Sequence, residues 1–227
     1  MLSLLDGDLI VYRVGYTTED VDATIACLRS RDMVERILSQ VNVDHFRIFL
    51  TADQDLTAFR RQIYPEYKAN RVKPRPKWYQ DIRDFLQIQY EAEVCYGIEA
   101  DDALGILQTQ NQDRSIICSI DKDLKQIPGY HYHFVKEEKS YVTPEEGLRV
   151  FYTQLLTGDS SDHIKGIYGL GPKKAEQILS GLVDEQALFD KVRSVYANDV
   201  EMLMNGRCLH IWKKAEDDWI NHWNLLI

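Results

Sequence analysis

The stretch Gly97-Ile98-Glu99-Ala100-Asp101-Asp102-Ala103-Leu104 places three carboxylates within four residues. If a helix begins near Glu99, then Glu99 and Asp102 lie three positions apart and share one of its faces. Two such charges about 4 Å apart repel by ~4 kcal/mol at an effective dielectric constant of about 20. A fold that gathers them therefore supplies a cation or raises a pKa. For this stretch alone, the simpler alternative is an acidic first turn that complements the helix dipole.

Short apolar runs elsewhere in the chain predict the sheet to which this helix belongs. Five runs are predicted as strands, the last near a sheet edge: 2–5, 46–50, 93–96, 115–118 and 130–135. Helical spacing occupies the segments between them: about 20–40 (one or two helices), 55–63, 78–90 and 99–110. This alternation of strands and helices predicts an α/β fold with a central, mostly parallel sheet flanked by helices.

Acids follow four of the predicted strands, and more acids follow a later helix. In a parallel sheet, groups just beyond the carboxyl ends of the strands converge on one crevice. Each acid alone could cap a helix, but we expect nine of them to share one site: Asp6, Asp53, Glu99, Asp101, Asp102, Asp121, Asp123, Asp159 and Asp162.

Carboxylates without His or Cys select hard cations, so this set predicts Mg²⁺, with Mn²⁺ as a substitute. So many acids imply two ions, which together can support hydrolysis of a phosphodiester. The expected ligands of the first ion are Asp6, Asp53, Glu99 and Asp101, with Asp121 near or between the two ions. Those of the second, several through water, are Asp102, Asp123, Asp159 and Asp162.

A basic segment follows the second strand. The net charge of −9 argues against a simple electrostatic nucleic-acid binder. From Arg60 to Lys77, however, there are seven basic residues and a single acid, Glu66. We expect Lys68 and Arg71 to contact a scissile phosphate, although a solvated basic loop is the alternative. Four aromatic residues could stack on unpaired bases: Tyr64, Tyr67, Trp78 and Tyr79.

The second half of the chain is predicted to be helical. A helix with Pro144 at its first position runs to about Leu156, and a glycine-rich hairpin at 166–171 leads into another helix that starts at Pro172. Backbone amides there could bind a phosphate, helped by Lys173 and Lys174; an ordinary helix–turn–helix is the alternative. In the final 45 residues we expect one helix face to carry three packing residues: Trp212, Trp219 and Trp223.

Composition limits the remaining classes. No apolar run approaches the ~20 residues of a membrane span. The four cysteines are scattered without metal or disulfide spacing, as in reduced cytoplasmic proteins. The histidines show no ligand spacing, and we interpret His131 and His133 as structural or solvent-facing.

Six blocks of this sequence resemble the 5′-nuclease (flap endonuclease) superfamily, most closely its phage 5′–3′ exonucleases and the 5′-nuclease domains of bacterial DNA polymerase I. Four blocks are Gly97-Ile-Glu-Ala-Asp-Asp102, Ser119-Ile-Asp-Lys-Asp-Leu124, Gly158-Asp-Ser-Ser-Asp162 and Gly169-Leu-Gly-Pro-Lys173. The other two are Leu5-Asp-Gly-Asp8 and Pro65-Glu-Tyr-Lys-Ala-Asn-Arg71.

The resemblance implies a PIN-like catalytic core over residues 1–142, with an arch or clamp at about 64–78. It also implies a helical region over 143–227, with a SAM-like helix-3-turn-helix at about 159–182 that grips duplex DNA, often with a bound monovalent cation such as K⁺. The implied catalytic residues are Lys68, Arg71, Asp101 and Asp121. The implied DNA contacts are Tyr67, Lys68, Arg71, Lys73, Gly169, Gly171, Lys173 and Lys174. The arch is short and broken by prolines, which leaves the threading of flaps open.

The leading hypothesis is a metal-dependent, structure-specific 5′-nuclease, monomeric, that cuts DNA, or RNA on DNA, at 5′ ends, nicks and flaps. Removal of RNA primers beside a replication polymerase in phage-type replication would suit it. A PIN-type ribonuclease is one alternative, but it needs neither the glycine-rich hairpin nor the basic insertion. A DNA-binding protein without catalysis is another, although it gains nothing from nine carboxylates facing phosphates.

Overall fold

A six-stranded sheet forms the centre of the computed structural model, which describes residues 1–43, 45–55 and 57–223. Its spatial order is β3-β2-β1-β4-β5-β6. The strands are β1 (Leu2–Asp6), β2 (His45–Thr51), β3 (Glu93–Cys95), β4 (Ser115–Cys118), β5 (Gly129–His133) and β6 (Glu138–Val142). The first five are parallel, and β6 pairs antiparallel with β5. The predicted α/β class and mostly parallel sheet are therefore confirmed.

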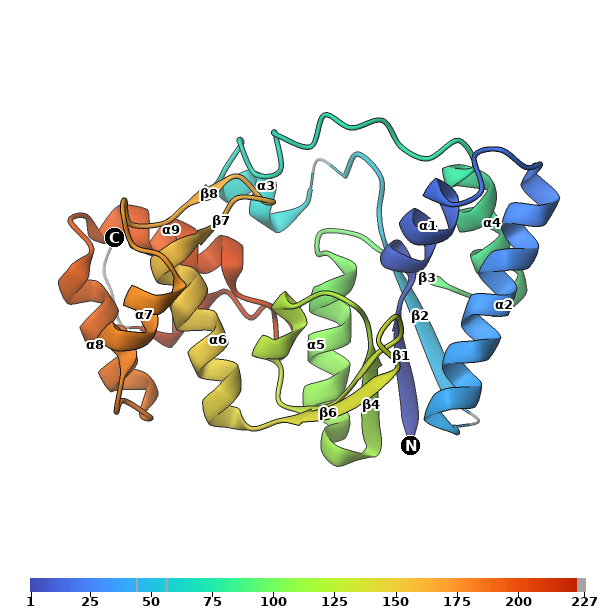
Figure 1. The fold of residues 1–227 in the computed structure, drawn as a ribbon. Coiled ribbons are helices and arrows are strands. Elements are labelled where there is room, and N and C mark those ends of the chain that lie inside the picture. The colour runs from blue at the N-terminus through green and yellow to red at the C-terminus, as the bar shows by residue number, and fades with distance from the viewer. Residues whose placement is uncertain (44, 56, 224–227) are drawn as a thin grey trace.

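Helices cover both faces of this sheet (Figure 1). Three of them pack together on one face: α1 (Gly7–Tyr16), α2 (Ala23–Val41) and α4 (Tyr79–Tyr90). On the other face, α5 (Ala100–Asn111) lies across β1, β2 and β4. Fully buried aliphatic side chains such as Ile10, Ile82 and Leu104 hold these layers together, at about 1.5–3 kcal/mol each.

Helix α1 is absent from the sequence prediction, and it begins directly where β1 ends. The Asp6 side chain caps it by accepting from the backbone N–H of Leu9 at 3.1 Å. Gly7 permits the sharp turn, because a Cβ there would lie 2.6 Å from the carbonyl oxygen of Phe49. The strand-to-helix turn therefore fixes Asp6 at the carboxyl edge of the sheet.

The second half of the chain builds a helical region with its own apolar core. Its elements are α6 (Pro144–Thr157), β7 (Gly158–Asp159), β8 (Ile164–Lys165), α7 (Pro172–Leu179), α8 (Glu185–Val195), α9 (Asp199–Leu209) and a short 3₁₀ helix, η3 (Trp219–His222). As predicted, α6 has Pro144 at its first position, and Thr143 and Glu146 form a capping box before it. Within the range 159–182 the structure shows the β7–β8 hairpin, a turn and α7.

The tryptophans pack into the molecule as predicted, but they do not share a helix face, so that part of the prediction is wrong. Trp212 lies in an irregular segment after α9, where its ring packs edge-on against Phe59 at a centroid distance of 5.1 Å. Trp219 belongs to η3 and is buried against Phe151 and Phe189. Within the described chain, no helix has the length and apolar character needed to cross a bilayer.

Residues 64–78, which we call the strap, pass over the carboxyl edge of the sheet from the short α3 (Phe59–Ile63) to α4 (Figure 1). At one end, the backbone N–H of Lys68 donates to the carbonyl of Asp162 at 3.0 Å. At the other end, the Tyr16 hydroxyl donates to the carbonyl of Pro74 at 2.8 Å. The strap therefore joins the sheet half of the molecule to the helical half.

Candidate active site

Three carboxylates at the carboxyl edge of the sheet form the centre of the site. Asp6 ends β1, Asp101 lies in the first turn of α5, and Asp121 follows β4. Burial, together with the charges of Asp8 and Asp121, raises the pKa of Asp6 to about 7. Burial and the charges of Asp6 and Asp121 likewise hold the pKa of Asp101 well above its usual range. Three acids far apart in sequence are therefore close enough to oppose one another's ionisation.

Little positive charge offsets this group. Among the described residues, no Lys or Arg forms an ion pair with Asp6, Asp101 or Asp121. Asp6 accepts from the Ser119 hydroxyl at 2.7 Å, and Asp121 accepts from the backbone N–H of Asp123 at 2.8 Å. An uncompensated set of this kind has the donor chemistry of a hard divalent cation site.

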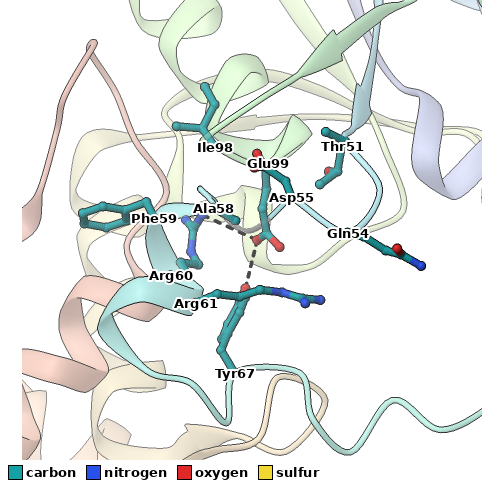
Figure 2. A pocket seen from close by; sticks show the side chains of 11 residues that line it. Thr51, Gln54, Asp55, Ala58, Phe59, Arg60, Arg61, Tyr67, Ile98 and Glu99 are labelled. Atoms are coloured by element: carbon teal, nitrogen blue, oxygen red, sulfur yellow. Dashed lines mark hydrogen bonds and ion pairs between the residues drawn. The ribbon is translucent and has the colours of Figure 1, made fainter.

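Glu99 connects the centre to the strap. It accepts from Lys68 Nζ at 2.5 Å and from the Tyr67 hydroxyl at 2.9 Å, and Arg60 Nη1 lies 3.5 Å from it. Burial opposes its ionisation, but the charges of Lys68 and Arg60 lower its pKa to about 2. Figure 2 shows Glu99 between Arg60 and Tyr67, on the wall of a cavity of about 50 Å³.

A second set of acids lies toward the helical region. Burial and the charge of Asp121 raise the pKa of Asp123 to about 6. Asp159 lies at the start of the β7–β8 hairpin, where it accepts from Lys122 Nζ at 3.0 Å and from the Ser161 backbone at 2.7 Å. Asp162, at the tip of the hairpin, pairs with Arg71 Nη2 at 2.5 Å and accepts from the Tyr67 hydroxyl at 2.9 Å.

The structure gives Asp102 a role other than the one predicted. Its buried carboxylate forms two hydrogen bonds with Arg60, at 2.6 and 2.8 Å. It also accepts from the backbone N–H groups of Glu99 and Trp212. Both of its oxygens thus already accept hydrogen bonds, so the structure gives no support to the expectation that it serves an ion. The capping alternative holds for this residue.

Asp53 lies just past β2, and Arg75 forms an ion pair with both of its oxygens at 2.8 Å. The Tyr79 hydroxyl donates to it as well. In the described part of the chain no hydrogen bond joins Asp53 to the other acids, so a metal role for it requires that Arg75 release it.

Asp8 is a member of the group that sequence reasoning missed. It accepts from the backbone N–H of Thr51 at 3.0 Å and from Arg83 Nη1 at 3.1 Å. Burial raises its pKa, and the charge of Glu99 adds to that shift. The signal was present in the block Leu5-Asp-Gly-Asp8, but its second acid falls inside a helix that the sequence prediction lacks.

The predicted aromatic contacts are partly wrong. The rings of Tyr67 and Tyr79 are buried, 4% and 6% exposed, so neither offers a face to an unpaired base.

The predicted DNA contacts of the second half lie around the first turn of α7. Gly171 is its N-cap residue, and Gly169 adopts a φ of +73° that favours glycine. Lys173 is exposed, whereas Lys174 Nζ donates to the Gly169 carbonyl at 2.9 Å. Four predicted contacts thus surround one helix start.

The carboxylates are gathered but not closed around a point. In the described chain, no three of them bring their oxygens within 4.8 Å of one another. Lys68 and Arg71 lie against Glu99 and Asp162, which draws those two acids toward the strap. The donor set nevertheless fits divalent ions, because its members are carboxylates, which are oxygen ligands, and their negative charges repel one another.

Comparisons with known proteins agree with this arrangement. The family model described as "5′-3′ exonuclease, N-terminal resolvase-like domain" matches residues 1–153. Flap endonuclease Xni of Shewanella baltica (strain OS185) is 30% identical over 221 residues, which cover 90% of this chain and 83% of the relative. The 5′-3′ exonuclease of Buchnera aphidicola subsp. Schizaphis graminum (strain Sg) is 29% identical over 223 residues, 89% of this chain and 75% of the relative.

Two solved structures share the fold. The T5 D15 protein co-crystallised with metal ions has a TM-score of 0.72 at 15% identity, and the match covers 92% of this chain and 89% of that one. The catalytic core of Rad2 in complex with DNA substrate has a TM-score of 0.56 at 13% identity, with 96% and 80% covered. Fold and sequence matches together define a nuclease. The chain belongs to the 5′-3′ exonuclease family, within the 5′-nuclease (flap endonuclease) superfamily.

Proposed function

We propose that this protein is a Mg²⁺-dependent, structure-specific 5′-nuclease that hydrolyses phosphodiester bonds at 5′ ends, nicks and 5′ flaps of DNA. The observation that carries the proposal is the gathering of Asp6, Asp101 and Asp121, which oppose one another's ionisation and, within the described residues, form no ion pair with Lys or Arg. They lie beneath a strap that presents Lys68 and Arg71. In this proposal the carboxylates bind divalent ions, and Lys68 and Arg71 bind a phosphate of the substrate.

We propose two sets of ligands, and the positions of the acids support them. Around the first ion we place Asp6, Asp8, Glu99, Asp101 and Asp121. Around the second we place Asp123, Asp159 and Asp162, several through water. Divalent ions bound there would supply an activated water and charge stabilisation for the phosphodiester. Mn²⁺ should substitute for Mg²⁺, because both prefer oxygen ligands.

The chain's own cations have a second task. Lys68 Nζ and Arg71 Nη2 lie 2.5 Å from Glu99 and Asp162. Both side chains would become available to the oxygens of a phosphate if these acids held divalent ions. A guanidinium suits a two-point contact with phosphate, whereas an ammonium acts as a point charge. Lys68 and Arg71 are therefore the proposed catalytic cations.

Duplex contacts are proposed at the start of α7 and on the strap. Amides at Gly169 and Gly171, with Lys173 and Lys174, would bind a phosphate of the duplex backbone, and a K⁺ ion in the same turn would assist. Solved structures of the same fold in complex with DNA, the Rad2 catalytic core and the T5 D15 flap endonuclease, support this. Lys73 would contact the single strand near the strap.

The test is a cleavage assay on labelled 5′-flap, nicked and blunt duplexes, with Mg²⁺, Mn²⁺ or EDTA, in which cut positions are mapped. We expect cleavage near the flap junction with either ion and none with EDTA. Asp121→Asn should abolish cleavage and retain DNA binding. Asp190→Asn, an exposed carboxylate on α8, is the matched control. Cleavage that survives both EDTA and Asp121→Asn would overturn the proposal.

The preferred strand needs a separate comparison. We propose that an RNA segment annealed to DNA is also degraded from its 5′ end, as primer removal in phage-type replication would require. A single protein molecule working beside a replication polymerase in the cytoplasm would suffice for this reaction. Equal rates on 5′-RNA and 5′-DNA flaps are expected, whereas cleavage of single-stranded RNA alone would favour a PIN-type ribonuclease.

A further inference from the structure

Two histidines and an aspartate gather in the C-terminal segment, separate from the acid group. His210 follows α9, Asp217 lies in the turn beyond it, and His222 ends η3. The Nε2 atoms of His210 and His222 each lie 3.0 Å from a different oxygen of Asp217. One ligand atom from each residue lies within 4.8 Å of the others, and this is the one such group in the described chain.

Burial and a backbone hydrogen bond fix the positions of these three side chains. His210 and Asp217 are 3% and 2% exposed, while the His222 side chain is 26% exposed, which leaves one side open to water. The Lys213 backbone N–H donates to Asp217 at 2.9 Å and orients the carboxylate.

From this geometry we infer that His210, Asp217 and His222 form a transition-metal site, with Zn²⁺ as the class of ion and water as the fourth ligand. Two imidazoles and one carboxylate are a ligand set of Zn²⁺ sites that keep an open position. Imidazole selects such metals over Mg²⁺, which prefers carboxylates and water. The chain would thus bind two classes of metal at two places.

The charges of Lys213 and Lys214 oppose the metal, and one contact supports the site. Lys214 Nζ lies 3.8 Å from Asp217, but its side chain is 73% exposed and can turn into solvent. The turn itself is anchored, because Arg207 pairs with the adjacent Asp218 at 2.6 Å. The ligands are therefore held by an ordered turn, and the amine of Lys214 can move away from Asp217.

The position of the site indicates what the metal would do. The carbonyl groups of Cys208 and His210 accept from Arg60, which in turn holds Asp102 of α5. A metal that joins His210 to His222 would close a loop at this end of the chain and hold the His210 carbonyl in place. Its role is structural, since in the described chain the loop contacts the buried Asp102 through the Trp212 backbone but has no hydrogen bond to Asp6, Asp101 or Asp121.

The test uses the full chain, stripped with EDTA, dialysed and then held in excess Mg²⁺ so that the carboxylates are occupied. Zn²⁺ is added and its binding is followed by calorimetry and by thermal denaturation. We expect one Zn²⁺ per chain and a rise of several degrees in melting temperature. With Co²⁺ instead, a visible absorption of four-coordinate cobalt should appear, and X-ray absorption of the zinc form should show imidazole scattering.

His222→Ala is the informative variant, because this partly exposed residue can be lost without opening the core. It should weaken Zn²⁺ binding by more than about 100-fold, since even outer-shell losses cost about 10–100-fold. His133→Ala, whose ring accepts from the Lys136 backbone elsewhere, should bind as the wild type does. Unchanged affinity in His222→Ala, or a wild-type chain that binds no Zn²⁺ in excess Mg²⁺, would show that Asp217 only bridges two histidines by hydrogen bonds.

Discussion

Asp6 shows how a single residue serves both fold and site. Its side chain caps α1 through Leu9, yet burial and neighbouring acids raise its pKa to about 7. A capping oxygen needs no negative charge, so the cap survives protonation. The metal-free protein can therefore keep its fold while some of these carboxylates are protonated.

In EDTA, Asp6→Asn should remove a pH dependence of stability. Between its ordinary pKa and about 7, the folded wild type holds a proton that the unfolded chain releases. This stabilisation is complete below the ordinary value and is lost as pH rises through about 7, at a cost of up to about 4 kcal/mol. Urea unfolding at about pH 5 and pH 8 should show the loss in the wild type and in the exposed Asp32→Asn control. Equal losses in Asp6→Asn would contradict the assignment.

Lys68→Ala should reduce the rate of cleavage more than it weakens binding of the flap. Lys68 has a φ of +58°, unusual for a residue with a side chain, and this conformation directs its amine to Glu99. We expect kcat to fall about 10²–10³-fold with a smaller change in KM, as for other groups that stabilise transition-state charge. Lys77→Ala, on the same strap but stacked on Trp78, is the control. A fall confined to KM would reduce Lys68 to a binding residue.

Sequence spacing located the acids but not the directions of their side chains. Glu99 and Asp102, the N-cap and N3 residues of α5, both lie beside Arg60. Asp102 pairs with it through both oxygens, because a buried guanidinium needs a carboxylate. Tyr67 reads as a base-stacking residue in a basic segment, but its ring completes the core of the helical region. Which partner a side chain meets depends on tertiary packing, which no local pattern contains.

At the scale of elements, the β7–β8 hairpin sets two of the acids in place. A glycine lies at each end of the hairpin. Gly158 has a φ of +72°, and a Cβ on Gly166 would lie 2.1 Å from the carbonyl carbon of Thr157. The hairpin displays Asp159 at its base and Asp162 at its tip. Glycine is required here by space as well as by conformation.

Gly166→Ala should therefore destabilise the fold and lower activity together. Backbone atoms cannot move aside as a side chain does, so the hairpin must shift, at a cost of about 1–3 kcal/mol. Urea unfolding measures the cost, and cleavage in saturating Mg²⁺ measures the displacement of the acids. Gly171→Ala is the stability control, because a Cβ there meets nothing within 4 Å. If both variants unfold alike, close packing at Gly166 is not the reason for its glycine.

The elements that sequence reasoning missed have physical explanations. Strand β6 is polar and mostly exposed at the sheet edge, so Glu138-Lys-Ser-Tyr-Val142 carries little apolar signal. Helix α1 follows β1 without a loop, which hides its start. The strands and helices that were predicted correctly, such as β4 and α5, are those whose apolar positions face the core.

For the molecule as a whole, Arg60 connects the two halves. Its guanidinium is buried and contacts Asp102 of α5 and the carbonyl groups of Cys208 and His210. Three segments separated by up to 150 positions thus share one cation. Removing it leaves a buried carboxylate without its charge partner.

Arg60→Met should cost about 3–5 kcal/mol in the free energy of unfolding, measured in urea. The double variant Arg60→Met/Asp102→Asn should recover part of that loss, because the stranded charge is gone. Arg61→Met, the exposed neighbour on α3, should change stability by less than about 0.5 kcal/mol. If the double variant loses as much free energy of unfolding as Arg60→Met and Asp102→Asn lose together, then Arg60 and Asp102 act independently.

The strap has one further consequence, for susceptibility to proteases. Trypsin cuts after Lys or Arg unless Pro follows, so Pro74 and Pro76 shield Lys73 and Arg75. Among the remaining basic residues of the strap, Lys68 pairs with Glu99 and Lys77 stacks on Trp78, whereas Arg71 precedes Val72, which is 87% exposed. The bond between Arg71 and Val72 is therefore the favoured site of cleavage. Trypsin must therefore bind Arg71, which is also proposed to contact a phosphate of the substrate. A flap substrate in Ca²⁺ should therefore slow digestion at this bond, so that the rate of nicking reports occupancy of the site.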